Sequence, residues 1–127
     1  MSKIKLNCWG MFFFLSSAIS VPSAAFAHHS FAMFDPKKEI TLEGTVVDFQ
    51  WTNPHAWIEL SVNENGTQVK YSLECSSPNV MARRGWSRKA LSPGDKVKIV
   101  MRPLRDGDRG GQMLRVIFSD GRSMENT

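Results

Sequence analysis

Apolar and polar side chains alternate along several short segments of the chain, a pattern typical of β-strands with one buried face. Residues 55–62 show it most clearly, with His55 and Trp57 on the face opposite to the apolar side chains. The alternation resumes over residues 67–75. Between these two segments, Asn65-Gly66 is a dipeptide that tolerates the positive φ of a tight turn. The pattern therefore predicts a β-hairpin.

Three more strands and one short helix follow from the same pattern. A first strand is predicted over residues 41–51, and two later strands over 96–102 and 112–118. A helix is predicted to begin at Ser77-Pro78, because an oxygen-bearing cap is followed by proline at the first helical position. The side chains expected to face inward are Thr45, Val47, Phe49 and Trp51 in the first strand and Val97, Ile99 and Met101 in the fourth.

The resulting order, three strands, a helix and two strands, is that of an OB-fold. The sequence therefore predicts an all-β protein, a small five-stranded OB-like barrel with a short helix between strands 3 and 4. We expect an N-terminal arm over residues 28–40, the barrel over 41–119 and a flexible tail over 120–127. About 100 residues suffice for one hydrophobic core and are too few for two.

The first 27 residues have the three zones of a signal peptide. Lys3 and Lys5 supply positive charge, residues 9–19 are dominated by apolar side chains, and Ala25-Phe26-Ala27 forms an A-x-A cleavage site. A membrane anchor is the alternative, but spanning a bilayer takes ~20 apolar residues, more than this run contains. We therefore expect residues 1–27 to be removed on export and the mature protein to be periplasmic or secreted, without a membrane anchor.

Removal of the leader changes the charge balance and the number of cysteines. Of the 16 Lys and Arg residues two leave with it, so that 14 basic and 12 acidic side chains remain. Such a balanced surface gives no reason to expect nucleic acid as a partner. Cys75 becomes the one cysteine of the mature chain, which excludes an intramolecular disulfide. The hydrophobic core must therefore hold the fold together.

Several short motifs of the mature chain occur together in one known family. They are His28-His29-Ser30-Phe31-Ala32, Gly44-Thr45-Val46, Trp51-Thr52-Asn53-Pro54-His55-Ala56-Trp57, Ser77-Pro78-Asn79, Arg83-Arg84-Gly85-Trp86 and Pro93-Gly94-Asp95. On these motifs the chain resembles an uncharacterised family of small exported bacterial proteins, a domain of unknown function, over essentially the whole mature chain. The resemblance implies no activity. Cys75 departs from the family pattern, where a small residue such as glycine is expected, and this argues against a role for the thiol.

Three histidines form the first candidate site. If cleavage occurs before His28, its free α-amine and its own imidazole can chelate one metal ion together. His29 or His55 would supply another imidazole, and such a set suits copper, zinc or nickel. An extended arm of residues 28–40 reaches at most ~40 Å, enough to run back along a first strand of about 30 Å to His55. Copper is the leading candidate, although histidines at these positions can also be incidental.

The second candidate site is a ligand face between two loops of the barrel. In an OB-like barrel the loops between strands 1 and 2 and between strands 4 and 5 flank this face. Aromatic, amide and guanidinium groups there suit an anionic small ligand or a partner protein. We found no catalytic triad, phosphate loop or zinc-hydrolase motif, so the sequence favours binding over catalysis. The candidate ligand-binding residues are Trp51, Asn53, Trp57, Arg105 and Arg109.

The mature protein is predicted to begin at His28. The reason is the A-x-A pattern of Ala25-Phe26-Ala27, whereas cleavage after Ala25 fits the peptidase preference less well. Intact-mass measurement and N-terminal sequencing of the exported protein test this. If the exported chain begins at Phe26 or is uncut, His28 has no free α-amine, and the metal hypothesis depends on that amine.

Overall fold

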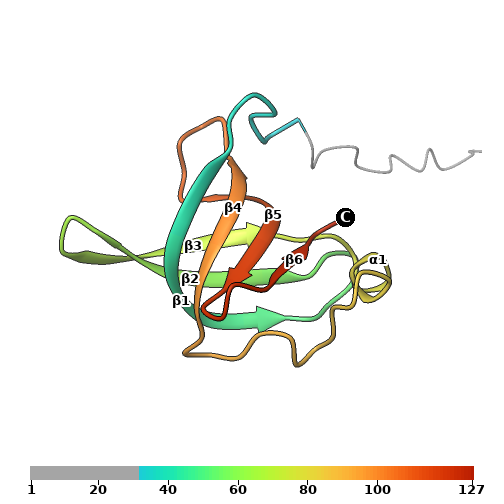
Figure 1. The fold of residues 1–127 in the computed structure, drawn as a ribbon. Helices are drawn as coiled ribbons and strands as arrows, with labels where there is room; N and C mark the ends of the chain where they lie inside the picture. The colour runs from blue at the N-terminus through green and yellow to red at the C-terminus, as the bar shows by residue number, and fades with distance from the viewer. Residues whose placement is uncertain (1–31) are drawn as a thin grey trace, which may run out of the picture.

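The computed structural model describes residues 32–127, which contain six strands and one short helix (Figure 1). The helix α1 lies beyond the end of β3, where the chain leaves the first three strands (Figure 1). The elements are β1 (Ile40–Gln50), β2 (Trp57–Glu64), β3 (Thr67–Glu74), α1 (Pro78–Ala82), β4 (Lys96–Pro103), β5 (Gly110–Phe118) and β6 (Ser123–Glu125).

The strands close into a barrel. β1 pairs antiparallel with β2 on one edge and with β4 on the other, β2 pairs with β3, and β4 pairs with β5. A short parallel pairing completes the circle, because Ser72 and Glu74 of β3 lie opposite Gly110 and Gln112 of β5. This is the strand order of an OB-fold with its helix between β3 and β4. The predicted fold class is confirmed.

The core is formed by the inward faces of the barrel strands. Ile58 and Leu60 of β2, Leu73 of β3, and Ile99 and Met101 of β4 have no exposed surface. All five belong to the alternating sets that the sequence predicts to be buried. Burying a side chain of this size is worth about 1.5–3 kcal/mol. A core of such residues holds the fold without a disulfide.

For the first half of the first strand, the prediction of which side chains face inward is wrong. Leu42 and Val46 are buried, whereas Val47 is 42% exposed. The register against β2 shifts between Val46 and Asp48, so Val47 is an extra residue in a β-bulge. Beyond the bulge Phe49 packs against the core. The inward residues have even numbers before the bulge and odd numbers after it. One alternating pattern therefore cannot describe the whole strand.

The helix begins where the sequence predicts. Ser77 is the N-cap, its side chain accepts a hydrogen bond from the Val80 amide, and Pro78 follows at the first helical position. After α1, Gly85 adopts a positive φ of 90° and turns the chain back toward the barrel. Trp86 is then 3% exposed and packs in the core cluster. Because the Trp86 ring meets that of Phe49, this segment covers the end of the barrel beside residues 51–56, which join β1 to β2 and are called the β1–β2 corner below.

The prediction of a flexible tail over residues 120–127 is wrong, since the chain adds β6 to the edge of β5. The Trp86 indole N–H donates to the Glu125 carbonyl at 2.7 Å. Asn126 is buried, and its side-chain oxygen accepts a hydrogen bond from the Ser76 amide at 2.7 Å. Only three residues form the strand, too few to show an alternating pattern.

The predicted leader, residues 1–27, and the two histidines that follow it lie outside the described residues. Of the predicted arm, the part from residue 32 onward is described. Phe34 is buried there and forms a bridge with Leu104 at the end of β4. Within residues 32–127, no helix is long and apolar enough to cross a membrane.

Asn126→Ala should lower the free energy of unfolding by ~1–2 kcal/mol, because the Ser76 amide loses its acceptor. Asn126→Asp keeps an acceptor at the same place and should cost less. Thr127→Ala, at an exposed neighbour, is the control. Urea unfolding at fixed pH measures all three, and equal midpoints for Asn126→Ala and the control would show that the C-terminal contact is not stabilising.

Candidate functional site

Two adjacent strands bring His55 and Glu74 together at one end of the barrel. His55 precedes β2, and Glu74 is the last residue of β3. In the β2–β3 pairing Trp57 lies opposite Glu74, so the chain at His55 continues past the end of β3. Two further backbone hydrogen bonds between Ala56 and the residues after β3 extend the ladder beyond both strands. The corner is therefore held by backbone pairing on both sides.

The imidazole of His55 and the carboxylate of Glu74 are in direct contact, with Nδ1 2.5 Å from Oε1. The Glu74 side chain is only 11% exposed, whereas that of His55 is 35% exposed. A carboxylate bound at Nδ1 fixes the orientation and tautomer of the ring and leaves Nε2 for an external partner. The pair can thus present one oriented imidazole nitrogen at the surface.

Burial governs the titration of the groups at this corner. Desolvation raises the pKa of the Glu74 carboxyl, and the charge of the adjacent His55 imidazole lowers it by a smaller amount. Burial also raises the pKa of the Cys75 thiol strongly, and the negative charge of Glu74 raises it further. The buried thiol is thus held in its protonated form, whereas the thiolate is the form that acts as nucleophile or metal ligand. Cys75 is a core residue, as its phase in the third strand predicts.

His55 is the one predicted metal ligand that lies within the described residues, since His28 and His29 precede them. Residues 32–127 contain no group of three or more His, Cys, Asp or Glu side chains that could hold a metal ion. A metal ion at His55 would therefore need ligands from residues before 32 or from outside the chain.

The aromatic and amide members of the predicted ligand face remain at the β1–β2 corner. Trp51 follows β1 and meets the ring of Phe49 edge to face, with 5.7 Å between the ring centroids. Asn53 is exposed, and its peptide bond to Pro54 is cis. Trp57 is half-buried opposite Glu74. Three predicted residues thus share one corner with the His55–Glu74 pair.

The two arginines of the predicted ligand face are engaged elsewhere. Arg105 Nε donates to the Phe34 carbonyl at 3.0 Å and so binds the β4–β5 loop to the arm. Arg109 pairs with Glu64 at the end of β2 at 3.1 Å. The Tyr71 hydroxyl donates to the same carboxylate, and these two contacts lower the pKa of Glu64. Both guanidinium groups therefore stabilise the position of the loop.

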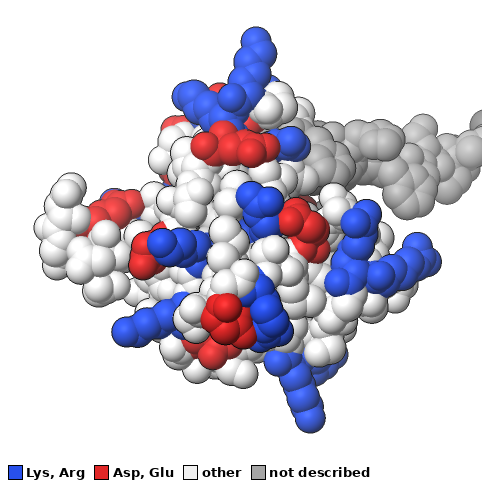
Figure 2. Space-filling model, viewed as in Figure 1, with Lys and Arg blue, Asp and Glu red and all other residues white. Residues whose placement is uncertain are grey.

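Other charged side chains are distributed over the surface. Lysines and arginines alternate with acidic residues over the visible face (Figure 2). Arg102 and Arg115 each lie within ion-pair distance of a glutamate, Glu39 and Glu125 respectively. The exposed arginines 83, 84 and 88 after α1 form no ion pair with any described residue. Charged side chains of both signs therefore share the visible face.

Glu74 was missed as a site residue, although the hairpin contains the signal for it. A tight turn at Asn65-Gly66 pairs Glu64 with Thr67 and, counting along both strands, Trp57 with Glu74. This register places Glu74 opposite the first residue of β2 and thus near His55, two residues earlier. The burial of that glutamate depends on the rest of the fold and does not follow from the register.

Comparison with known proteins gives one match. A protein-family model described as a family of unknown function, DUF6152, matches residues 17–113. No curated protein and no solved structure matches the chain.

Glu74 should titrate above the ordinary glutamate pKa of 4.5, and His55→Ala should raise its pKa further by removing the imidazole charge. Because the raised pKa means that the folded state binds this proton more tightly than the unfolded state, the stability contributed is present at low pH and is lost as the pH rises through the raised pKa. Carbon-13 NMR of the glutamate carboxyls measures the titration.

Urea unfolding of the wild-type protein and of Glu74→Gln across the same pH range measures the effect on stability. The variant should lack this part of the pH dependence, since its side chain does not ionise. A Glu74 signal that titrates at or below 4.5 would contradict burial as the dominant influence.

Proposed function

The chain belongs to DUF6152, a family of unknown function, and we propose that it is an exported protein that binds a transition-metal ion, with copper as the leading candidate. The proposed ligands are the α-amine and imidazole of His28, the imidazole of His29 and Nε2 of His55. The site would serve binding or handling of the metal in the periplasm or outside the cell. The observation that carries the proposal is the contact between His55 and Glu74.

The contact supports the proposal because metal-bound histidines commonly donate their second ring N–H to a carboxylate. At this corner Nδ1 of His55 lies against Glu74, so Nε2 is the nitrogen that remains for a metal ion. The carboxylate is largely buried and the imidazole is partly exposed. An ion approaching from solvent would therefore meet an imidazole whose orientation is already fixed. Such preorganisation lowers the cost of binding.

The chemistry of a chain that begins with histidine supplies the remaining ligands. An N-terminal amine has a pKa near ~8, low enough for a metal ion to displace its proton at neutral pH. Together with the His28 imidazole it forms a chelate through nitrogen atoms of one residue. His29 adds a second imidazole next to it. Nitrogen ligands of this kind favour copper over other divalent first-row metals.

The position of the described part of the arm is compatible with this site. Phe34 bridges to Leu104, whose amide donates to Gly110, and Gly110 lies opposite Ser72 of β3. These three strand spacings amount to ~14 Å, and the end of β3 lies two residues further along. The six residues from His28 to Phe34 can extend ~20 Å. The length of the chain therefore allows the N-terminal amine to reach the corner.

The mature chain is expected to bind Cu(II) in a 1:1 complex near neutral pH, and its affinity should fall as the pH decreases, because protons compete for the amine and the imidazoles. Extending the start by Gly-Ser should weaken binding strongly, since the amine moves away from the His28 imidazole. His29→Ala and His55→Ala should each remove one ligand. Glu74→Gln should weaken binding by roughly tenfold or more through His55.

Isothermal titration of native protein, extended protein and these three variants measures the affinities, and circular dichroism checks that each is folded. Glu59→Gln is the matched control, because Glu59 lies on the outward face of the neighbouring strand β2 and accepts a hydrogen bond from the Ser72 hydroxyl instead. Equal affinity of native and extended protein would exclude the amine as a ligand. If no form binds copper, zinc or nickel better than micromolar, the alternative of a metal-free interaction module for an anionic ligand or partner protein replaces metal binding.

A further inference from the structure

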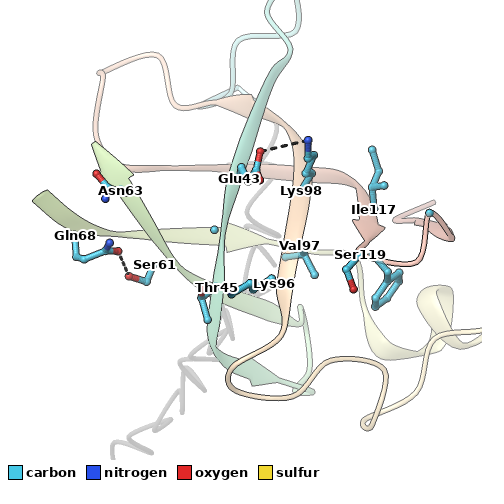
Figure 3. A pocket seen from close by; sticks show the side chains of 13 residues that line it. Glu43, Thr45, Ser61, Asn63, Gln68, Lys96, Val97, Lys98, Ile117 and Ser119 are labelled. Carbon is cyan, nitrogen blue, oxygen red and sulfur yellow. Dashed lines mark hydrogen bonds and ion pairs between the residues drawn. The ribbon is translucent and has the colours of Figure 1, made fainter. Parts of the chain in front are cut away.

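A groove of about 500 Å³ crosses the outer face of the barrel at a distance along the strands from the His55 corner (Figure 3). Each of the five barrel strands contributes to its lining, from Gln68 of β3 to Ile117 of β5. A volume of this size lies within the range of small-molecule sites. Four strand spacings separate the outer strands, about 19 Å along the sheet, so a matching ligand is extended.

The strand register places polar side chains in a row across this groove. Thr45 of β1 lies opposite Ser61 of β2 on one side and opposite Lys96 of β4 on the other. Figure 3 shows these three side chains coming from three different strands. Gly44 precedes Thr45, and a Cβ there would collide with the Ser61 carbonyl. The absence of a side chain at Gly44 lets β1 and β2 approach closely where the groove crosses them.

Two amide side chains at one end of the groove have their oxygens already occupied. Asn63 Oδ1 accepts a hydrogen bond from the Gly66 amide at 2.8 Å, and Gln68 Oε1 accepts one from the Ser61 hydroxyl at 2.9 Å. The amide nitrogens each carry two N–H donors. Neither of them donates to another group within residues 32–127. This end of the groove therefore offers hydrogen-bond donors.

The charged side chains at the middle of the groove also favour a ligand that presents oxygen acceptors. Lys98 is paired with Glu43, with 3.3 Å between Nζ and Oε2 (Figure 3). Lys96 is exposed and forms no ion pair with any described residue. With two lysines and one glutamate, the lining carries one positive charge in excess. An ammonium group is a donor without acceptor capacity, so it adds to the demand for oxygen acceptors.

A smaller hollow beside the groove is lined by Lys96 together with two aspartates. Each of the two carboxylates has a partner of its own. Asp120 is paired with Arg122 at 2.7 Å. Asp95 accepts a hydrogen bond from the Ser92 amide at 2.9 Å. Neither forms an ion pair with Lys96. The ammonium group therefore remains available to an external anion.

From this geometry we propose that the groove binds an acidic oligosaccharide, with its carboxylate or phosphate at Lys96 and its hydroxyl and ring oxygens at the Asn63 and Gln68 amides. Sugars present many oxygen acceptors along an extended chain, which matches the donors on four neighbouring strands, from Gln68 of β3 to Lys96 of β4. Half-buried Ile117 supplies an apolar contact for the C–H face of a sugar ring. The proposal is independent of metal binding, because no groove residue belongs to the His55 corner.

The experiment is a nitrogen-15 NMR titration of the mature protein with four probes. Trigalacturonate presents carboxylates, maltotriose 6-phosphate presents a phosphate on a chain of the same length, maltotriose is a neutral trisaccharide, and inorganic phosphate is an anion without sugar. Trigalacturonate or maltotriose 6-phosphate should shift the side-chain NH₂ signals of Asn63 and Gln68 and the backbone signals of Thr45, while maltotriose and phosphate should bind at least about tenfold more weakly. The stronger of the two acidic sugars identifies the anionic group.

Lys96→Gln should weaken the acidic sugar by about tenfold, as expected for a lost charged hydrogen bond. Lys89→Gln removes the same charge from an exposed position outside the groove and should leave the affinity unchanged. His55→Ala should also leave it unchanged, which separates this result from the metal proposal. The proposal is overturned if the two lysine variants behave alike, if maltotriose binds as tightly as trigalacturonate, or if no probe shifts the groove signals at millimolar concentration.

Discussion

The short parallel pairing between β3 and β5 is the constraint on which the rest of the structure depends. Without it, the sheet β3-β2-β1-β4-β5 would remain open, and the backbone groups on the edge of β3 opposite to β2 would be unpaired. The pairing needs glycine on the β5 side. A Cβ at Gly110 would lie 3.0 Å from the Ser72 carbonyl of β3, whereas one at Gly111 would collide with the Arg102 carbonyl and the Met101 sulfur of β4. Gly110 therefore lets β5 approach β3 where the barrel closes, and Gly111 lets β5 pack against β4.

Closure also explains why one end of the barrel carries a buried carboxylate. Glu74 lies at the seam, between Trp57 of β2 and Gln112 of β5, so strands cover it from both sides. Its exposure to water is thereby reduced, and the imidazole of His55 supplies its polar partner. A paired imidazole whose second nitrogen points away from the carboxylate is the physical basis of the proposed metal site. The proposed saccharide groove, in contrast, depends on the outward row of side chains toward the other end of β2 and β3.

Periodicity identified most of the fold because most strands have one buried and one exposed face. Ile58 and Leu60, like Ile99 and Met101, occupy the inward positions that the alternation predicts. The predictions were wrong at the places where the tertiary structure departs from the local pattern of apolar and polar residues. Val47 is displaced to the outside by a bulge, and the chain after Asp120 forms a strand that owes its place to contacts with residues about 40 or 50 positions earlier.

The sequence by itself determined the order of the helix and the five barrel strands, His55 as a candidate ligand and the inward face of β2, β3 and β4, because each of these depends on residues close together along the chain, and the barrel class was inferred from that order. Tertiary structure decided that Glu74 is buried against His55, that Arg105 and Arg109 stabilise loops, and that Lys96, Asn63 and Gln68 share one groove. The physical reason is that burial and side-chain contact arise between strands, and the register and closure that bring strands together are properties of the whole barrel.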